Sequence, residues 1–483
     1  AANHSREQDF RLRAAVDDNG FILGIENEYF TSQGAYIRTH GATVTDLSAA
    51  MLPGPYLVPS YRTQGRVRLT NKTPCGTYRS PGRYESTFAR ERLVDLIAHR
   101  MGIDPVEIRR RNLIPRDLMP YSRGIVNHGT PLVYDSGDYA LLLEKLLDQI
   151  RYEDIVKQLE ARRADGELVG LGIGYFVEKS GLGPYDDVRI EMTRDGAIEV
   201  VTGVASIGQG VETVIAQICA DTLGVDYQTI RVTHGQTDRI ERGMGAFASR
   251  VTVMTGSATA DAAGQLRQRL IETAAERLQM PVGTLSITSA VIAGPEGSKG
   301  PSMHVGDAAA VYLDEYGGDV VSAEATFEAT HMTYPYGIHL AIVSVDPKTA
   351  GVDIERIVVA YDIGRSVNPM LVEGQISGGM AQGIGGALYE EFLYTEEGQP
   401  ISATFADYLW PTAQEVPEVE AIVTEDAPSG TNPLGLKGAG ECGINASGAA
   451  IASAVGQAIG NPEAVTQLPI TPLRLHEILK RQQ

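Results

Sequence analysis

The chain has 483 residues and is acidic, with 41 lysines and arginines against 61 aspartates and glutamates and a formal net charge of −20. This charge repels nucleic-acid backbones and anionic membrane surfaces, which argues against both as partners. The cysteines Cys75, Cys219 and Cys442 form no C-x-x-C pair and the histidines do not cluster, so we expect no disulfide framework and no zinc or iron–sulfur site. No apolar run reaches about 18 residues, which predicts a cytoplasmic protein without membrane insertion.

The first part of the chain, residues 1–150, is expected to form one domain. An alternating segment at residues 20–30 predicts a strand that follows a turn with almost no lead-in. This abrupt start predicts that an upstream segment is missing or belongs to another polypeptide. A helix is expected around Leu93, Ile97 and Met101, and another after Asp104, which has the composition of a helix N-cap.

The second part, residues 151–483, alternates strands with helices and predicts a mixed α+β fold. Strands are expected at residues 188–193, 197–204, 228–234, 339–346 and 352–361, with a hairpin between the last two. Glycine-rich loops are expected at residues 206–210, 243–250, 374–383 and 432–443, and each is expected to lead into a helix. Helices that begin at such loops present free N–H groups and a positive dipole end, which suit an anion.

The polar residues of these loops indicate a large polar ligand. Gln209, Ser249, Gln375 and Gln382 can donate and accept hydrogen bonds, as a heterocycle with ring nitrogens and a keto group requires. The loops do not fit the spacing of dinucleotide-binding or P-loop motifs, so the hypothesis is a pterin or purine-like dinucleotide held by scattered loops. Close helix packing is the alternative explanation of the glycines. Glu441, the carboxylate in the loop at residues 432–443, could face such a ligand or could instead cap the helix that follows.

Four segments, in order along the chain, resemble the molybdenum-binding large subunit of the xanthine oxidase family. They are D-P-V-E-I-R-R-R-N at 104–112, G-Q-G-V-E-T at 208–213, the block from G-R-S-V-N-P to G-G-M-A-Q-G at 364–383, and K-G-A-G-E at 437–441. Each is weak alone, but together they are specific, and the match runs through nearly the whole chain. The resemblance implies the α+β fold of this family's elongated molybdenum-cofactor-binding domains.

The resemblance also implies a cofactor and a reaction. The cofactor would be molybdopterin, with the cytosine dinucleotide as the expected form, and its dithiolene would hold the molybdenum without a protein ligand. Glu441 would be the general base in the oxidation of an N-heterocycle or aldehyde carbon, with water as the oxygen source. The residues expected at the cofactor are Gly208, Gln209, Gly210, Ser249, Arg250, Thr252, Asn368, Gln375, Gln382, Lys437, Gly438 and Gly440.

The loop at residues 76–83 bears on the substrate. Ser80 stands where aerobic carbon monoxide dehydrogenases carry the cysteine that holds copper, and Cys75 lies five residues too early. An organic substrate is therefore favoured, and a carbon monoxide dehydrogenase is the alternative. Arg79 and Tyr84 would then touch the substrate, with packing or pterin contact as the alternative for each.

The resemblance further implies partner chains. Family large subunits carry about 300 further residues upstream, roughly two domains, so either another chain supplies that segment or the sequence is a fragment. Partner subunits would carry [2Fe-2S] clusters and FAD in a hetero-oligomer, as a dimer of heteromers. A non-catalytic scaffolding half-subunit is a further alternative, against which Glu441 argues. Structural roles are expected for Cys442, His331 and His339.

Overall fold

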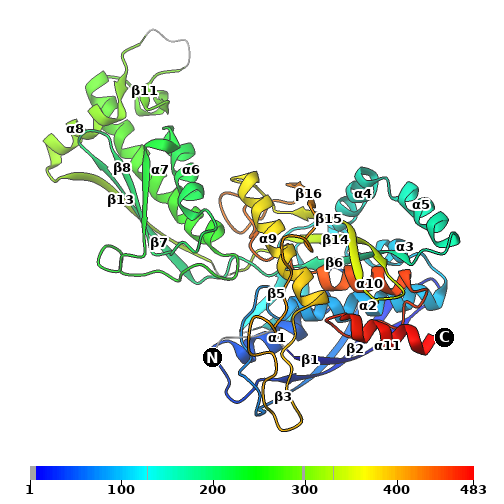
Figure 1. The fold of residues 1–483 in the computed structure, drawn as a ribbon. Coiled ribbons are helices and arrows are strands. Elements are labelled where there is room, and N and C mark those ends of the chain that lie inside the picture. The colour runs from blue at the N-terminus through cyan, green and yellow to red at the C-terminus, as the bar shows by residue number, and fades with distance from the viewer. Residues whose placement is uncertain (1–6, 128, 296–299, 330, 483) are drawn as a thin grey trace.

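The computed structural model describes residues 7–127, 129–295, 300–329 and 331–482. Figure 1 shows a large body that holds both ends of the chain and an outlying lobe, drawn in green. The fold is a mixed α+β architecture, as predicted.

The strands are β1 (Gln8–Val16), β2 (Ile22–Ser32), β3 (Ser60–Arg68), β4 (Tyr121–Asn127), β5 (Thr130–Tyr134), β6 (Val169–Val177), β7 (Tyr185–Thr193), β8 (Ile198–Thr202), β9 (Ile230–His234), β10 (Ser286–Thr288), β11 (Val291–Ala293), β12 (Met303–His304), β13 (Val320–Glu328), β14 (Tyr336–Val345), β15 (Val352–Asp362) and β16 (Val419–Thr424). The α-helices are α1 (Gly41–Met51), α2 (Arg83–Met101), α3 (Pro105–Asn112), α4 (Tyr139–Ile150), α5 (Tyr152–Ala164), α6 (Val211–Leu223), α7 (Val251–Leu278), α8 (Val305–Tyr316), α9 (Pro369–Leu388), α10 (Ser447–Ala458) and α11 (Pro472–Gln482).

The body is built on a four-stranded sheet in the order β16-β15-β14-β6. Every residue of β6 is buried, as are nine of the ten residues of β14, because helices or other segments cover both faces. Helix α10, which is rich in alanine and glycine, lies directly against β6. Small side chains allow this close approach of helix and sheet.

The lobe is inserted between two neighbouring strands of that sheet. Strands β6 and β14 pair antiparallel in the body, and β7 and β13, which directly continue them in the chain, pair antiparallel in the lobe. An isolated bridge between Ser180 and Thr333 joins the two connecting segments. The chain therefore enters and leaves the lobe through one paired, two-stranded connection.

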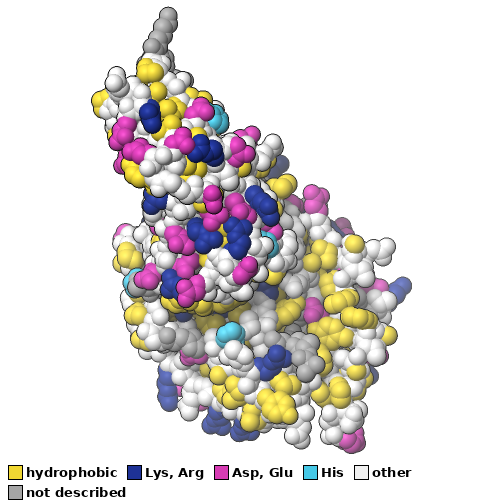
Figure 2. Space-filling model, turned by 90° about the vertical axis from the view of Figure 1, so that its left-hand side faces the viewer, with side chains coloured by type: hydrophobic (Ala, Val, Ile, Leu, Met, Phe, Trp, Pro, Cys, Tyr) yellow, Lys and Arg dark blue, Asp and Glu magenta, His cyan; other side chains and the backbone are white. Residues whose placement is uncertain are grey.

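The lobe has one apolar and one charged sheet face. Its sheet runs β13-β7-β8-β9, and alternate residues of β7 are buried against the helices of the lobe. The opposite face carries ion pairs such as Arg239 with Glu199 and Arg242 with Asp187. Figure 2 shows side chains of both charges mixed on the surface of the lobe.

The predicted elements are largely confirmed. All five predicted strands of the second part are present, β14 and β15 form the predicted hairpin, and the Asp104 side chain caps α3 by accepting from the backbone N–H groups of Val106 and Glu107. The proposed division at residue 150 remains a prediction; there the chain forms α4 and α5, and a turn after Ala164 leads into β6. Within the described part of the chain, no helix combines the length and apolar character needed to cross a membrane.

Two expectations were wrong. The strand at residues 22–32 does have a lead-in, because β1 pairs with it across the turn at residues 17–20. The glycine-rich segment 374–383 is not a loop but the middle of α9. Its buried residues Val372, Ile376, Met380 and Ile384 recur every fourth position, which is the helical signal that the glycines obscured.

Candidate active site

The site is centred on Glu441, in the loop between β16 and α10, whose residue surface is 8% exposed. Its Oε2 accepts a hydrogen bond from the Ser249 hydroxyl at 2.8 Å, and its Oε1 accepts one from Arg83 Nη2 at 3.0 Å. Ser249 reaches it from the loop before α7, where Ala248 and Ser249 both have a positive φ, at 50° and 47°. This left-handed conformation is costly for residues with a Cβ and persists where the surroundings enforce it.

The glycines of the K-G-A-G-E segment make room for Ser249. A Cβ on Gly438 would lie 2.4 Å from the Ser249 Cβ, and one on Gly440 would lie 2.9 Å from its Oγ. The two loops therefore pack at a distance that side chains would forbid. This contact explains why small residues flank the carboxylate.

A second carboxylate, Glu178, lies behind Glu441 and was missed in the sequence. It follows the buried strand β6, is fully buried, and pairs with Nη2 of Arg83. Ser80 Oγ donates to Glu178 Oε2 at 3.3 Å, and Asn445 Nδ2 donates to the same oxygen. The sequence did hold one signal for Glu178, because it is an acidic residue that directly follows an entirely apolar strand.

The titration of Glu178 is strongly perturbed. Burial raises its pKa, Arg83 opposes that rise, and the nearby Glu441 adds to it, so that the pKa is about 7. Glu178 is thus a buried carboxyl that titrates near neutral pH and shares its partner Arg83 with Glu441. Such strongly shifted pKa values are typical of functional sites.

Arg79 gathers several of the predicted cofactor residues. Its guanidinium donates to Gln382 Oε1 at 3.0 Å, to the Oε1 and backbone carbonyl of Gln375 at 3.0 and 3.1 Å, and to the carbonyl of Gly440. Arg79 thus joins α9 to the residue before Glu441. The predicted substrate contact of Arg79 remains a prediction.

A separate group of predicted cofactor residues lies where α6 and α9 begin. A Cβ on Gly210 would meet the Leu371 side chain at 2.6 Å, and Asn368 caps α9 while donating to Gln217 Oε1 of α6 at 3.1 Å. Gln209 Oε1 accepts from the backbone N–H of Ile207, whose side chain is exposed. Gly208 and Gly210 both have positive φ, which glycine adopts without strain.

Other predicted residues have their side chains engaged elsewhere. Arg250 is buried and pairs with Asp186 at 2.8 Å, and Lys437 is buried with its Nζ donating to the carbonyls of Ser136 and Tyr334. Thr252 is half-buried in the first turn of α7. The Tyr84 hydroxyl lies close to Gly386 of α9 and Gly448 of α10. These side chains hold the segments of the site together, and any cofactor or substrate contact by them remains a prediction.

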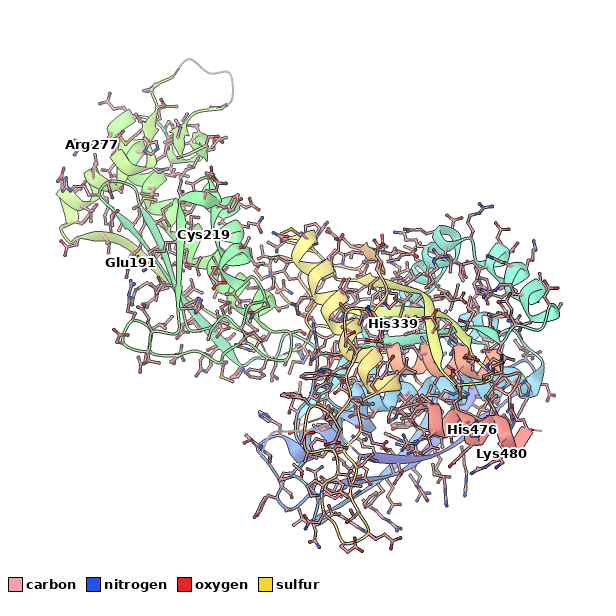
Figure 3. All side chains as sticks on the ribbon, in the orientation of Figure 1. Glu191, Cys219, Arg277, His339, His476 and Lys480 are labelled. Carbon is pink, nitrogen blue, oxygen red and sulfur yellow. The ribbon has the colours of Figure 1, made fainter. Side chains whose placement is uncertain are left out.

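The residues after Glu441 are held by a buried histidine. His339 Nε2 lies 3.0 Å from the carbonyl of Cys442, and burial lowers the pKa of His339 to about 3, so the ring is neutral and its Nε2–H donates. Cys442 is buried, and its thiol donates to the carbonyl of Ala439. Figure 3 places His339 within the body, away from the lobe that contains Cys219. His339 and Cys442 thus act in packing.

The donor set fits an anionic pterin cofactor. Helices α6 and α7 begin without a side-chain cap, so N–H groups of their first turns remain as donors for a ligand. Arg79 and the glutamines add donors and acceptors nearby. Among the described residues, no group of three or more His, Cys, Asp or Glu side chains could hold a metal ion.

The comparisons with known proteins agree with this geometry. Two family profiles, both described as molybdopterin cofactor-binding domain, match residues 1–113 and residues 145–417, respectively. The gamma subunit of the 6-hydroxypseudooxynicotine dehydrogenase complex of Paenarthrobacter nicotinovorans is 41% identical over 98% of this chain and 60% of its own length. The nicotine 6-hydroxylase large subunit of the same organism is 31% identical over 98% of this chain and 59% of its own length.

A solved structure extends the likeness to three dimensions. Quinoline 2-oxidoreductase from Pseudomonas putida 86 superposes with a TM-score of 0.90 at 31% identity, over 99% of this chain and 63% of that one. The chain therefore spans about three fifths of the length of the relatives it matches. Through its cofactor-binding domains, the chain belongs to the xanthine oxidase family of molybdenum-binding large subunits.

Proposed function

We propose that this chain supplies the general base of a molybdenum-dependent oxidoreductase that oxidises a carbon atom of an N-heterocycle. The observation that carries the proposal is Glu441, a nearly buried carboxylate with both oxygens held, at a point where the body meets the lobe. A base needs a fixed orientation and a site from which water is largely excluded.

The residues of the chain divide the work of the site. Ser249 and Arg83 each donate to one oxygen of Glu441, and since each carboxylate oxygen accepts two bonds, both keep a lone pair for a proton. The uncapped starts of α6 and α7, with Gln209, Gln375 and Gln382, would hold the molybdopterin. The bound molybdenum cofactor supplies the two-electron redox chemistry.

The names of the relatives and the contacts of Ser80 support the proposed substrate class. The relatives' names refer to nicotine, a nicotine derivative and quinoline, all nitrogen heterocycles, which favours an N-heterocycle over an aldehyde. Ser80 is buried and donates to Glu178, so this position carries a structural hydroxyl in place of a thiolate that could bind copper. That contact supports an organic substrate over carbon monoxide.

Partner chains complete the proposed enzyme. Two relatives are named as subunits of larger assemblies, and the cysteines of this chain are three separate buried thiols. We infer that [2Fe-2S] clusters and FAD lie on partner subunits and that the pterin is the cytosine dinucleotide.

Exchange of the base tests the proposal. In the natively purified complex, Glu441→Gln should keep molybdenum and pterin, measured by elemental analysis and fluorescence of the oxidised pterin. Turnover of quinoline or nicotine should fall about 10²- to 10⁴-fold, the range that a general base contributes. The matched control Glu463→Gln removes a surface partner of Arg100 and should keep normal rates. Near-normal turnover of Glu441→Gln, or a wild-type complex without molybdenum, would refute the proposal.

A further inference from the structure

One guanidinium nitrogen serves two buried carboxylates. Arg83 Nη2 donates to Glu441 Oε1 at 3.0 Å and also to Glu178 Oε1. The side chains of Arg83 and Glu178 are 3% and 1% exposed, and that of Glu441 is 10% exposed. Two carboxylates thus compete for one cation in a place where water screens their repulsion weakly.

Among the described residues, no other cation forms an ion pair with either acid, since Arg79 lies near Glu441 but donates to carbonyl and amide oxygens. Tyr361 from β15 and Cys442 from the loop of Glu441 face Glu178, but burial raises the pKa of both, so they stay neutral at physiological pH. Lys179 is adjacent in the chain, but its ammonium donates to Asn127 at 2.7 Å, and burial together with Arg83 lowers its pKa to about 8. Ser80 and Asn445 donate neutral hydrogen bonds to Glu178.

We propose that Glu178 is a positioning residue that sets the basicity of Glu441 by sharing Arg83 with it. The inference rests on the proposed function, in which Glu441 is the base. When Glu178 is ionised, it draws on the charge of Arg83 and repels Glu441, which makes Glu441 a stronger base. When Glu178 holds a proton, Arg83 pairs with Glu441 alone and makes it a weaker base.

The shared cation makes the titrations of the two acids interdependent. Two groups that interact this closely lose their protons in steps that belong to the pair. The elevated pKa of Glu178 agrees with this coupling, because the charge of Glu441 is one of its causes. The coupling therefore has a signature that does not depend on turnover.

An infrared titration of the purified complex measures that signature. The wild-type complex should show a protonated carboxyl C=O band that disappears as the pH rises through neutrality and is missing in Glu178→Gln. In Glu441→Gln the midpoint of this band should fall by about one pH unit, because the opposing charge is gone. The control Glu390→Gln removes a half-buried carboxyl bonded to Tyr408 and should leave the midpoint unchanged. An unshifted midpoint in Glu441→Gln would overturn the coupling.

A pH–rate profile then distinguishes an effect of Glu178 on the basicity of Glu441 from a purely structural role of Glu178. In Glu178→Gln the acid limb of kcat/KM should move about one unit to lower pH, with a lower kcat on the plateau, and Glu178→Asp should restore the wild-type limb. A lower kcat with an unmoved acid limb would overturn the inference. If the wild-type complex turns over no substrate, the proposed function fails, while the infrared midpoints still decide whether the two acids are coupled.

Discussion

The chain contains two buried ion networks whose charge balance is opposite. In the body, on α2 and α3, Glu91 and Asp95 pair with Arg90, Arg92 and Arg109, so cations outnumber carboxylates. At the candidate site, Glu178 and Glu441 both pair with Arg83, so among the ion-paired groups carboxylates outnumber cations. Both networks are buried, and α2 contributes to each.

The excess of arginines is satisfied by the backbone. Arg109 pairs with both carboxylates and donates to the carbonyls of Pro105 and Ile173, and Arg90 donates to carbonyls of Leu52 and Tyr175. Burial lowers the pKa of Arg109, but Asp95 and Glu91 outweigh it and raise the pKa overall. Arg109 therefore stays charged at every physiological pH, and the network around it acts as a fixed support.

The excess of carboxylates is not balanced in that way, because Ser80, Asn445 and Ser249 donate neutral hydrogen bonds that leave the negative charge in place. A proton is the remaining way to neutralise the second acid. The comparison shows how one helix can support a rigid network and a titrating one, depending on which charge is in excess.

Removal of Arg109 should have the largest effect on stability. Arg109→Met leaves Glu91 and Asp95 buried with fewer donors, and breaking a buried pair in this way costs about 3–5 kcal/mol of unfolding free energy. Denaturant titration followed by circular dichroism measures it. The control Arg110→Met removes partly exposed pairs with Glu107 and Glu144 and should cost about 0–1 kcal/mol. Equal losses in the two variants would show that the Arg109 network is not a support.

Substitution of glycines in α9 should have an intermediate effect that depends on the face of the helix. A Cβ on Gly383 would lie 2.0 Å from Ser447 Oγ and 2.7 Å from its Cβ, so Gly383→Ala should cost about 1–3 kcal/mol by overpacking. Gly374 is exposed with no atom within 4 Å of such a Cβ. Gly374→Ala should therefore stabilise the helix by about 0.5–1 kcal/mol. Thermal unfolding of both variants measures the difference, and effects of the same sign would contradict the packing of α9 on the loop before α10.

The smallest effect concerns the pH dependence of stability at the site. The pKa of Glu178 is about 7 in the folded chain, above its usual value, so the folded state binds the proton more tightly than the unfolded state. Its contribution to stability is therefore fully present at acid pH and is lost as the pH rises towards and through 7, by at most about 1.4 kcal/mol per pH unit. Glu178→Gln should flatten this slope in unfolding curves recorded at several pH values, whereas Arg110→Met should leave it unchanged. If the unfolding free energy of Glu178→Gln still fell with rising pH as steeply as in the wild type, the pH dependence would come from another group.

Much of the fold could be predicted from local patterns, because periodicity and caps act within a few residues. Asp104 capped its helix and the hairpin between β14 and β15 formed as predicted. The glycines of α9 misled the prediction, since their use is the close approach of Gly379 and Gly383 to the loop and helix start at residues 443–447, a contact between distant segments. Local propensity cannot register such a contact.

The candidate site was predictable where a motif carried it and hidden where only the fold assembles it. Glu441 and the glutamines lie in recognisable segments. Glu178 lies 263 positions before Glu441 and meets it only because β6 ends beside that loop, with Arg83 reaching both from α2. Contacts of Arg250 and Lys437 with the cofactor remain a prediction, and what the sequence did not indicate is that the fold places their charges against Asp186 and against backbone carbonyls.

Helix α7 links the lobe to the candidate site, because it runs through the lobe and begins beside the connection to the body. This helix has 28 residues, so it is about 42 Å long, and its first turn follows Ser249, which holds Glu441. A rotation of the lobe about its connection would move Ser249 and so change the hydrogen bond to Glu441. Contacts at the far end of the lobe would therefore bear on the orientation of this carboxylate.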